Sequence, residues 1–207
     1  MPARSSPARW ITTNSRRPSP IPADPLIPHE SPVVRTARPA DAAALPATER
    51  SAAQRFASIP ALAWLATGDV MAAQAHLACI AAGTCWVVED ATGAIAGFLS
   101  ADMRHDCLHI LEFSVRKDAQ GQGLGRALLQ AAMIRVRRSR VKGGLTLTTF
   151  RDIPWNAPFY RAMGFEDLAV PDPWLVELLA QEVAHGLPPG SRCAMRWHAR
   201  ETDLDVA

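Results

Sequence analysis

Apolar and polar positions follow two periods along the chain after residue 32, and each period predicts a different kind of element. Alternating or continuous apolar runs predict strands at residues 33–37, 84–89, 95–101, 107–115, 145–150, 165–170 and 192–199. Helical spacing predicts helices at residues 41–56, 70–82, 123–139, 154–163 and 174–184. The order of these elements predicts a mixed α/β fold of the α+β type.

The ends and connections of the first elements rest on a few residues. We expect Asp41 to cap the first helix, Asp69 to cap the second, and Gly83 to end the second. Residues 59–67 between these helices are apolar and broken by proline, so they predict an irregular connection. The turn at residues 90–93 predicts a hairpin between two early strands.

The helix expected at residues 123–139 has one apolar face and one basic face. The apolar residues at helical spacing are Leu124, Ala127, Leu128, Ala131 and Ile134. Arginines crowd the opposite face and the end of the helix, where cations interact favourably with the helix dipole. We interpret this basic run as a solvated face rather than as a nucleic-acid site.

The composition is that of one globular domain with a tail. The chain has 207 residues, of which 48% are apolar and 20% charged, enough for one sizeable core. A net charge of +2 gives no electrostatic reason to expect nucleic acid as a partner. The uncharged stretch at residues 70–88 contains polar residues and a glycine, so it predicts no membrane span.

Cysteine usage and the first 32 residues bear on where the protein acts. Four cysteines form no CxxC pair, which indicates neither a zinc site nor a redox pair and fits a reduced, cytoplasmic protein. Residues 1–32 hold eight of the 17 prolines and predict a disordered extension before a domain at 33–207. A transit peptide, or a start codon assigned too far upstream, is the alternative.

The most informative segment is QGQGLGRALL, residues 120–129, between a predicted strand and a predicted helix. Its alternating glycines let the backbone approach a ligand, and the helix start offers unpaired N–H groups, which together suit a pyrophosphate. Arg126 and Leu128 stand where a dinucleotide fingerprint needs Gly or Ala, and no Lys completes a P-loop. The alternative is a glycine-rich turn with no ligand.

This segment resembles a motif of the GNAT superfamily of N-acetyltransferases. The spacing Gln120-x-x-Gly123-x-Gly125 matches its Q/R-x-x-G-x-G/A motif, and HILEFSVRKDAQGQGLG resembles its fourth strand and acyl-CoA loop. TTFRDIPWNAPFYRAMGF resembles the fifth strand and next helix, and VVRTARPADAAAL the start of the fold. The resemblance covers residues 33–170 and implies a central mixed sheet of six or seven strands flanked by helices.

The resemblance also implies how acetyl-CoA is held as a cosubstrate, without a metal. The fourth and fifth strands are expected to splay apart, with the pantetheine arm pairing along Phe113, Ser114 and Val115. The Val115 N–H is the position expected to bind the thioester carbonyl. The residues expected to hold the pyrophosphate through their N–H groups are Gln120, Gly121, Gln122, Gly123, Leu124, Gly125 and Arg126.

The resemblance gives Tyr160 and Asn156 roles beside the sulfur of CoA. Tyr160 would protonate the departing thiolate, for which a phenol with a pKa of about 10 is suited. The alternative is a core aromatic residue with its hydroxyl at the surface. Asn156 would bind the cofactor arm or orient Tyr160, and its alternative is an N-cap or turn residue.

Glu112 is a carboxylate inside an otherwise apolar strand, and we expect it to accept the proton of the attacking amine. The alternative is a glutamate at a strand edge that faces solvent or an arginine. If the strand is regular, one face carries Leu108, Ile110, Glu112 and Ser114.

Other residues carry weaker hypotheses. We interpret His105 and His109 as loop histidines rather than as a metal-binding pair, because no third ligand is evident. Trp64 and Trp155 are expected either in the wall of the acceptor pocket or in the core. Cys107 reads as a buried, inert thiol rather than an acyl carrier.

The sequence therefore predicts an N-acetyltransferase that moves an acetyl group from acetyl-CoA to a primary amine by direct attack in a ternary complex. A non-catalytic acyl-CoA-binding sensor, or an acyltransferase with another acyl chain or acceptor, is the alternative. A homodimer is compatible with the sequence. A cationic amine is suggested as the acceptor by Asp102, Asp106, Glu112 and Asp152.

Overall fold

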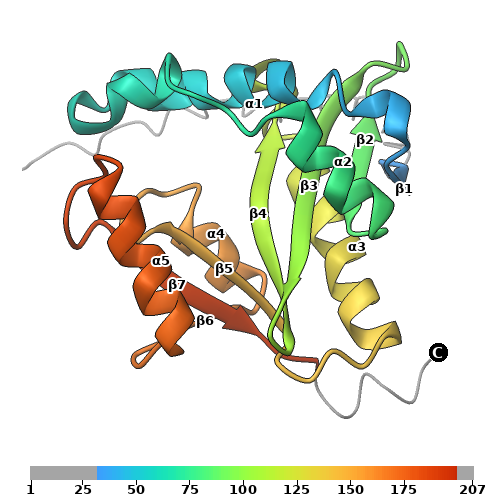
Figure 1. The fold of residues 1–207 in the computed structure, drawn as a ribbon. Coiled ribbons are helices and arrows are strands. Elements are labelled where there is room, and N and C mark those ends of the chain that lie inside the picture. Colours follow the sequence, from blue (N-terminus) through green and yellow to red (C-terminus); the bar gives the residue numbers. More distant parts are fainter. Residues whose placement is uncertain (1–31, 200–207) are drawn as a thin grey trace, which may run out of the picture. The chain divides into compact units, whose positions relative to one another are not determined.

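A computed structural model describes residues 32–199, which form one α/β unit (Figure 1). The extension expected over residues 1–32 lies, apart from Pro32, outside the described residues. A seven-stranded sheet has the order β1-β2-β3-β4-β5-β7-β6, which confirms the mixed sheet implied by the sequence. Its strands are β1 (Val34–Thr36), β2 (Cys85–Glu89), β3 (Ile95–Arg104), β4 (Cys107–Val115), β5 (Leu145–Phe150), β6 (Glu166–Asp167) and β7 (Arg192–Trp197).

Helices cover both faces of this sheet (Figure 1). The α-helices are α1 (Leu45–Ala53), α2 (Ala73–Ala81), α3 (Leu124–Arg138), α4 (Ala157–Ala162) and α5 (Pro173–Ala184). The short 3₁₀ helices are η1 (Pro39–Asp41), η2 (Gln54–Ser58), η3 (Pro60–Ala66) and η4 (Lys117–Ala119).

The strand–helix–strand unit β4–α3–β5 contains the one parallel pairing of the described sheet. In the described chain, β4 and β5 pair only at Leu108↔Leu145 and His109↔Thr146, near the start of each strand. Beyond these pairs the two strands diverge toward their carboxyl ends (Figure 1). Residues of both strands line a cavity at this place.

A bulge in β4 changes which residues share a face. Ala101 of β3 stands opposite Ile110, but its neighbour Ser100 stands opposite Glu112, so Leu111 is the extra residue. The expectation that Ile110 and Glu112 share one face is therefore wrong, because it assumed a regular strand. Ile110 belongs to the core cluster that contains α3, and Phe113 packs against the same cluster, so Glu112, next to Phe113 in the strand, faces the other side.

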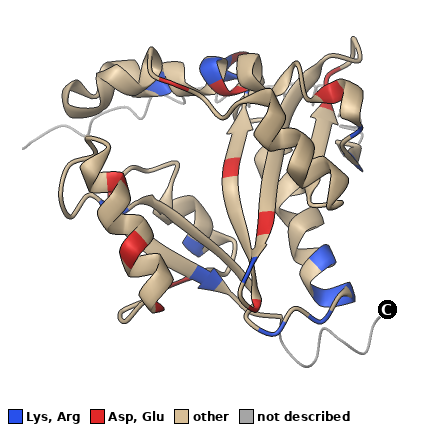
Figure 2. Cartoon of the chain, in the orientation of Figure 1, with Lys and Arg blue, Asp and Glu red and all other residues tan. Residues whose placement is uncertain are grey.

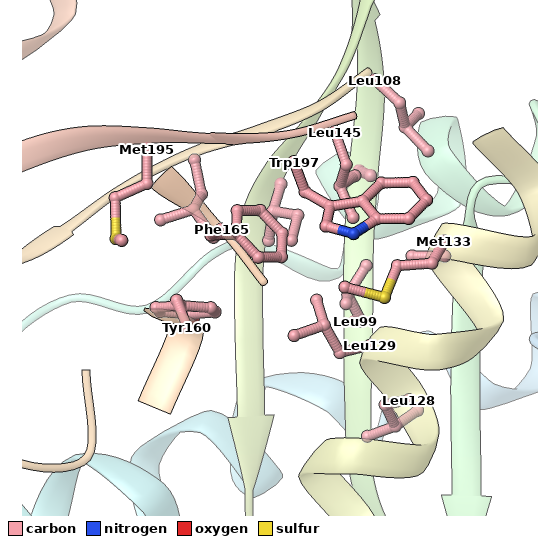
Figure 3. Packing of buried hydrophobic residues seen from close by; sticks show 14 of the residues in the cluster. Leu99, Leu108, Leu128, Leu129, Met133, Leu145, Tyr160, Phe165, Met195 and Trp197 are labelled. Carbon is pink, nitrogen blue, oxygen red and sulfur yellow. The ribbon is translucent and has the colours of Figure 1, made fainter. Parts of the chain in front are cut away.

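The main core lies between the sheet and α3. Leu128, Leu129 and Met133 of α3 are buried against strand residues that include Leu99 and Leu108 (Figure 3). A second cluster, on the other face, joins Leu45 of α1 and Ile80 of α2 to Phe98 of β3. The apolar face predicted for α3 is only partly right. Of its five residues, Leu128 alone is buried, three are half-buried and Ile134 is 44% exposed. The buried face is instead made by Leu128, Leu129, Ala132, Met133 and Val136. The basic face is confirmed as solvated: exposed arginines occupy the end of α3 (Figure 2).

The first two helices begin later than predicted. Asp41 does not cap α1, because its carboxylate pairs with Arg35 and accepts the Arg38 N–H within η1. Asp69 does not cap α2 either, since Ala72 holds the N-cap position. The connection 59–67 is largely 3₁₀ helix, and the strand expected at 165–170 shortens to β6. The hairpin between β2 and β3 is confirmed.

Candidate active site

A cavity of about 680 Å³ opens where β4 and β5 diverge. Its walls come from both strands, the loop before α3, α4 and α5, with α1 and η2 along one border. The predicted residues of β4 that line it are Glu112, Phe113, Ser114 and Val115. Tyr160 and Asn156 also line it, so the strand, loop and aromatic residues predicted from the sequence come together.

The edge of β4 that faces the cavity offers backbone groups to a ligand. The Arg116 N–H donates to the Ala96 carbonyl at 2.8 Å, which sets the alternation of the ladder with β3. Backbone groups of successive residues point to opposite sides in such a ladder, so Ser114 faces β3 while Phe113 and Val115 face away. An extended ligand can therefore hydrogen-bond to Phe113 and Val115 like an added strand.

The loop before α3 has the geometry of an anion site. Gly121 and Gly123 have φ angles of +80° and +82°, and Gly123 is the N-cap of α3. A Cβ atom at either glycine would meet no protein atom within 4 Å, so both positions face open space. The loop N–H groups, the start of α3 and Arg126 at the cavity wall therefore suit a phosphate group.

The loop residues do not all face the cavity. Gln122 is absent from its lining, and its side-chain amide instead contacts the Asp118 carbonyl at 3.4 Å. Gly125 lines the cavity next to Phe113, and a Cβ there would make an ordinary van der Waals contact of 3.4 Å with Cζ of that ring. The loop residues that line the cavity are Gln120, Gly121, Gly123, Leu124, Gly125 and Arg126.

Two carboxyl groups share the cavity, one predicted and one not. Glu112 accepts a hydrogen bond of 2.7 Å from the Ser114 hydroxyl, and Glu49 of α1 accepts one of 3.0 Å from the Met71 N–H. Burial, then the charge of Glu112, raises the pKa of Glu49 to about 8, and burial raises the pKa of Glu112 as well. Since the charged forms are disfavoured, the pair retains a proton near neutral pH.

Tyr160 combines a core position with access to the cavity. The residue is 8% exposed, and its ring packs edge-on against Phe165, with 5.6 Å between the ring centroids (Figure 3). It packs in the same way against Phe159, at 5.3 Å. No hydrogen bond among the described residues engages its hydroxyl group. Burial, and then the charge of Glu112, raises the pKa of Tyr160, so the phenol is protonated at neutral pH.

Asn156 stands at the N-cap position of α4, but its side chain does not cap the helix. Its Nδ2 donates a hydrogen bond of 3.0 Å to the Thr149 hydroxyl at the end of β5. Its Oδ1 is buried without a partner among residues 32–199. Because buried polar atoms are normally satisfied, this oxygen marks a position where a ligand N–H or O–H fits.

The histidines do not form a metal site. His109 is not in a loop as predicted but is buried in β4, where its ring contacts the Thr146 hydroxyl at 3.1 Å. Burial lowers its pKa to about 4, so the ring is neutral. His105 lies in the turn before β4 with φ of 54°. Within the described part of the chain, no group of His, Cys, Asp and Glu could hold a metal ion.

The remaining candidates divide between the wall and the core. Trp155 lines the cavity as one alternative predicted. Both alternatives for Trp64 are wrong, because it lies outside the lining and is 44% exposed at the surface. Cys107 is fully buried and burial raises the pKa of its thiol to about 11, which fits an inert cysteine. The aspartates 102, 106 and 152 do not line the cavity, so they give no support for a cationic acceptor.

Sequence reasoning missed several polar residues of the cavity. Glu182 of α5 forms an ion pair of 2.8 Å with Arg192 of β7, and the Thr148 hydroxyl hydrogen-bonds to both. Glu49 and Asp69 come from the first half of the chain. Acidic segments are visible on β4 and α5, which both border the cavity (Figure 2). None of these residues belongs to a motif, so the sequence carried no local signal for them.

None of the helices in residues 32–199 combines the length and apolar character needed to cross a membrane.

Comparison with known proteins agrees with this geometry. Residues 81–167 match the family model described as acetyltransferase (GNAT) domain. This segment runs from the end of α2 to β6 and contains β4, the glycine loop, β5 and Tyr160.

Three solved structures share the fold at low sequence identity. PaiA N-acetyltransferase from Thermoplasma acidophilum, in complex with coenzyme A, has a TM-score of 0.57 at 15% identity, covering 81% of this chain and 100% of its own. The ribosomal-protein-S18-alanine N-acetyltransferase from Escherichia coli has a TM-score of 0.54 at 17% identity, covering 83% and 97%. Rv2747 from Mycobacterium tuberculosis, in complex with CoA and NLQ, has a TM-score of 0.57 at 17% identity, covering 81% and 100%.

Proposed function

Since this chain carries a GNAT-type acetyltransferase domain, we propose that it transfers an acetyl group from acetyl-CoA to a primary amine within a ternary complex. The observation that carries this proposal is the opening between β4 and β5. A strand edge at Phe113 and Val115 leads there into a glycine loop at the start of α3. At Val115 the N–H is the group offered to a ligand, because the carbonyl already accepts a hydrogen bond from Gln120. One continuous surface thus offers backbone groups for an extended arm and an anion site for its phosphates.

Each part of acyl-CoA has residues suited to hold it. The N–H groups of the loop at residues 120–126 and the start of α3 would bind the pyrophosphate. Phe113 and Val115 would pair with the amide groups of the pantetheine arm, and the Val115 N–H would bind the thioester carbonyl. The buried Oδ1 of Asn156 would accept a hydrogen bond from that arm. Bound acyl-CoA supplies an activated acyl group.

The proton transfers fall to residues on opposite sides of the cavity. The amine arrives largely protonated and must lose a proton before it can attack, and Glu112 would accept that proton. Glu49 beside it raises the proton affinity of the pair toward neutral pH. Tyr160 keeps its phenolic proton at neutral pH and would give it to the departing thiolate.

The acceptor is a cationic amine, in our proposal, because the cavity beyond β4 is rich in carboxyl groups. Glu49, Asp69 and Glu112 all line it, although Glu182 is already paired with Arg192. The negative charge that remains on the Glu49–Glu112 pair would attract an ammonium group and repel an anion.

The four cysteines are free buried thiols, which supports the cytoplasmic location that the sequence suggests.

The test is release of free CoA thiol from acetyl-CoA in the presence of a panel of amines. The panel includes polyamines, aminoglycosides, peptides with a free N-terminus and lysine peptides, and mass spectrometry identifies the acetylated product. Turnover with at least one amine is expected. Binding of CoA without turnover on any amine would favour a sensor, and turnover confined to alcohols or longer acyl chains would favour a different acyltransferase.

A further inference from the structure

The short helix η2 carries an arginine that contacts two walls of the cavity. Nη1 of Arg55 donates a hydrogen bond of 3.1 Å to Oε1 of Gln120, in the loop before α3. Its Cζ atom lies 4.0 Å from the ring centroid of Trp155, which precedes α4. Arg55 therefore joins the candidate phosphate loop to the segment that follows β5.

Neighbouring contacts hold Arg55 in this position. The ring of Phe56 packs against that of Trp155, with 6.0 Å between the ring centroids, and so anchors η2. Nε2 of Gln120 donates a hydrogen bond of 2.9 Å to the Val115 carbonyl, which leaves Oε1 directed at the arginine. Both partners of Arg55 are thus fixed by contacts of their own, so the guanidinium is preorganised at the cavity.

Arg55 has donors left for a ligand. A guanidinium carries five N–H donors in one plane, and stacking on an aromatic ring uses only its face. Among residues 32–199, the acceptor in contact with it is the neutral amide of Gln120, and no carboxylate forms an ion pair with it. Its side chain lines the same cavity as Gly121 and Gly123.

We infer that Arg55 is an additional ligand of the acyl-CoA pyrophosphate, presented from η2 while the loop N–H groups bind from the start of α3. The inference rests on the proposed function, because it takes acyl-CoA as the ligand of the cavity. The guanidinium keeps its stacking on Trp155 and directs its free edge to phosphate oxygens, which form strong charge-assisted hydrogen bonds. Arg55 thereby favours acyl-CoA over thioesters of pantetheine, which lack the pyrophosphate.

The test compares two charge-neutralising variants by calorimetry with CoA as the probe. Arg55→Gln should weaken CoA binding by roughly 10–100-fold, the range for loss of charge-assisted hydrogen bonds. Arg138→Gln is the matched control, because this exposed arginine ends α3 about 20 Å from its start and lines no part of the cavity. It should change CoA affinity by less than twofold.

Two further probes identify the group that Arg55 contacts. Dephospho-CoA retains the pyrophosphate, so Arg55→Gln should weaken the binding of dephospho-CoA by the same factor as the binding of CoA. The affinity for pantetheine should not change. A loss confined to CoA would assign Arg55 to the 3′-phosphate and overturn the inference. CoA affinity within twofold of the parent would overturn it as well. Failure of the parent protein to bind CoA would instead refute the proposed function.

A spectroscopic measurement on the parent protein covers the case in which Arg55→Gln does not fold. The side-chain Nε signal of Arg55, assigned by its disappearance in Arg55→Lys, should shift on addition of CoA. Pantetheine should leave this signal in place. An Arg55 Nε signal whose chemical shift does not change at saturating CoA would contradict the inference.

Discussion

The Ser114 hydroxyl donates a hydrogen bond of 2.7 Å to Oε1 of Glu112, two residues earlier in β4. This bond lowers the pKa of Glu112, whereas burial, the larger effect, raises it. The two residues share a face because the bulge at Leu111 precedes both of them. A strand with hydrophobic neighbours therefore carries a carboxyl group whose proton affinity is adjusted by one hydroxyl and by the depth of the cavity.

Glu112→Gln tests the proposed proton acceptor. The amide has the same shape as the carboxyl but cannot take a proton at neutral pH, so kcat/KM should fall by roughly 10²–10⁴-fold. CoA affinity should stay within twofold, because the loop and strand edge are unchanged. Steady-state kinetics with an accepted amine and calorimetry with CoA measure the two quantities. A variant that keeps a third of the parental rate would assign the proton to water or to Glu49.

Glu49→Gln tests the coupled carboxyl pair through stability. The folded-state pKa of Glu49 is about 8, above its unfolded value near 4.5, so the folded protein binds an extra proton between these pH values. This favourable contribution is complete below pH ~4.5 and is lost as pH rises through about 8. As the pH rises, the free energy of unfolding should therefore decrease by about 1–2 kcal/mol less in Glu49→Gln than in the parent. This figure allows for solvent in the open cavity.

Urea unfolding at pH 5.5 and pH 8.5 measures this effect, as the difference between variant and parent at each pH. Glu177→Gln is the control, because Glu177 is an exposed residue of α5 away from the cavity lining. It should shift stability equally at both pH values. If Glu49→Gln behaves like this control, the pKa of Glu49 is not raised in the folded protein, either by burial or by Glu112.

Local patterns in the sequence predict the elements around the site well. β4 and β5 have the predicted bounds, 107–115 and 145–150, and α3 differs by one residue at each end. Each of these elements has an apolar pattern of its own, and glycines flank α3 and precede β5. The bounds of these elements therefore depend on residues close in sequence. The glycine loop between β4 and α3 was predicted from the same local signals.

Contacts between distant segments could not be predicted in this way. The bulge at Leu111 depends on the register with β3, which the sequence of β4 alone does not specify. Glu49 and Arg55 reach the cavity because α1 and η2 border it, more than 50 residues before the loop in the chain. Asp41 is a different case: it has the residue type of a helix cap, but an ion pair with Arg35, only six residues earlier, determines its position.

Gly123→Ala tests the phosphate loop, with Gly93→Ala as a matched control. Both glycines have φ near +80°, at +82° and +81°, and a Cβ at either position meets no protein atom within 4 Å. Each substitution should therefore cost a similar 1–2 kcal/mol of backbone strain, roughly, in thermal or urea unfolding. Only Gly123→Ala places a methyl group in front of the loop N–H groups, so it alone should weaken CoA binding, by about tenfold or more. Equal CoA affinities in the two folded variants would move the phosphate site elsewhere.

Tyr160→Phe separates the proposed proton donor from a packing role. Phenylalanine keeps the aromatic contacts with Phe159 and Phe165 and removes only the hydroxyl, which makes no hydrogen bond among the described residues. Thermal stability should therefore hardly change, and CoA affinity should stay within twofold. The rate should fall by roughly 10²–10⁴-fold, because the thiolate loses its proton donor.

The measurement needs an amine for which chemistry limits turnover, since slow product release would hide the loss. Because burial and Glu112 raise the pKa of this phenol, the parental rate should show no decline from its ionisation up to pH 9. A folded Tyr160→Phe enzyme within threefold of the parent would leave protonation of the thiolate to water.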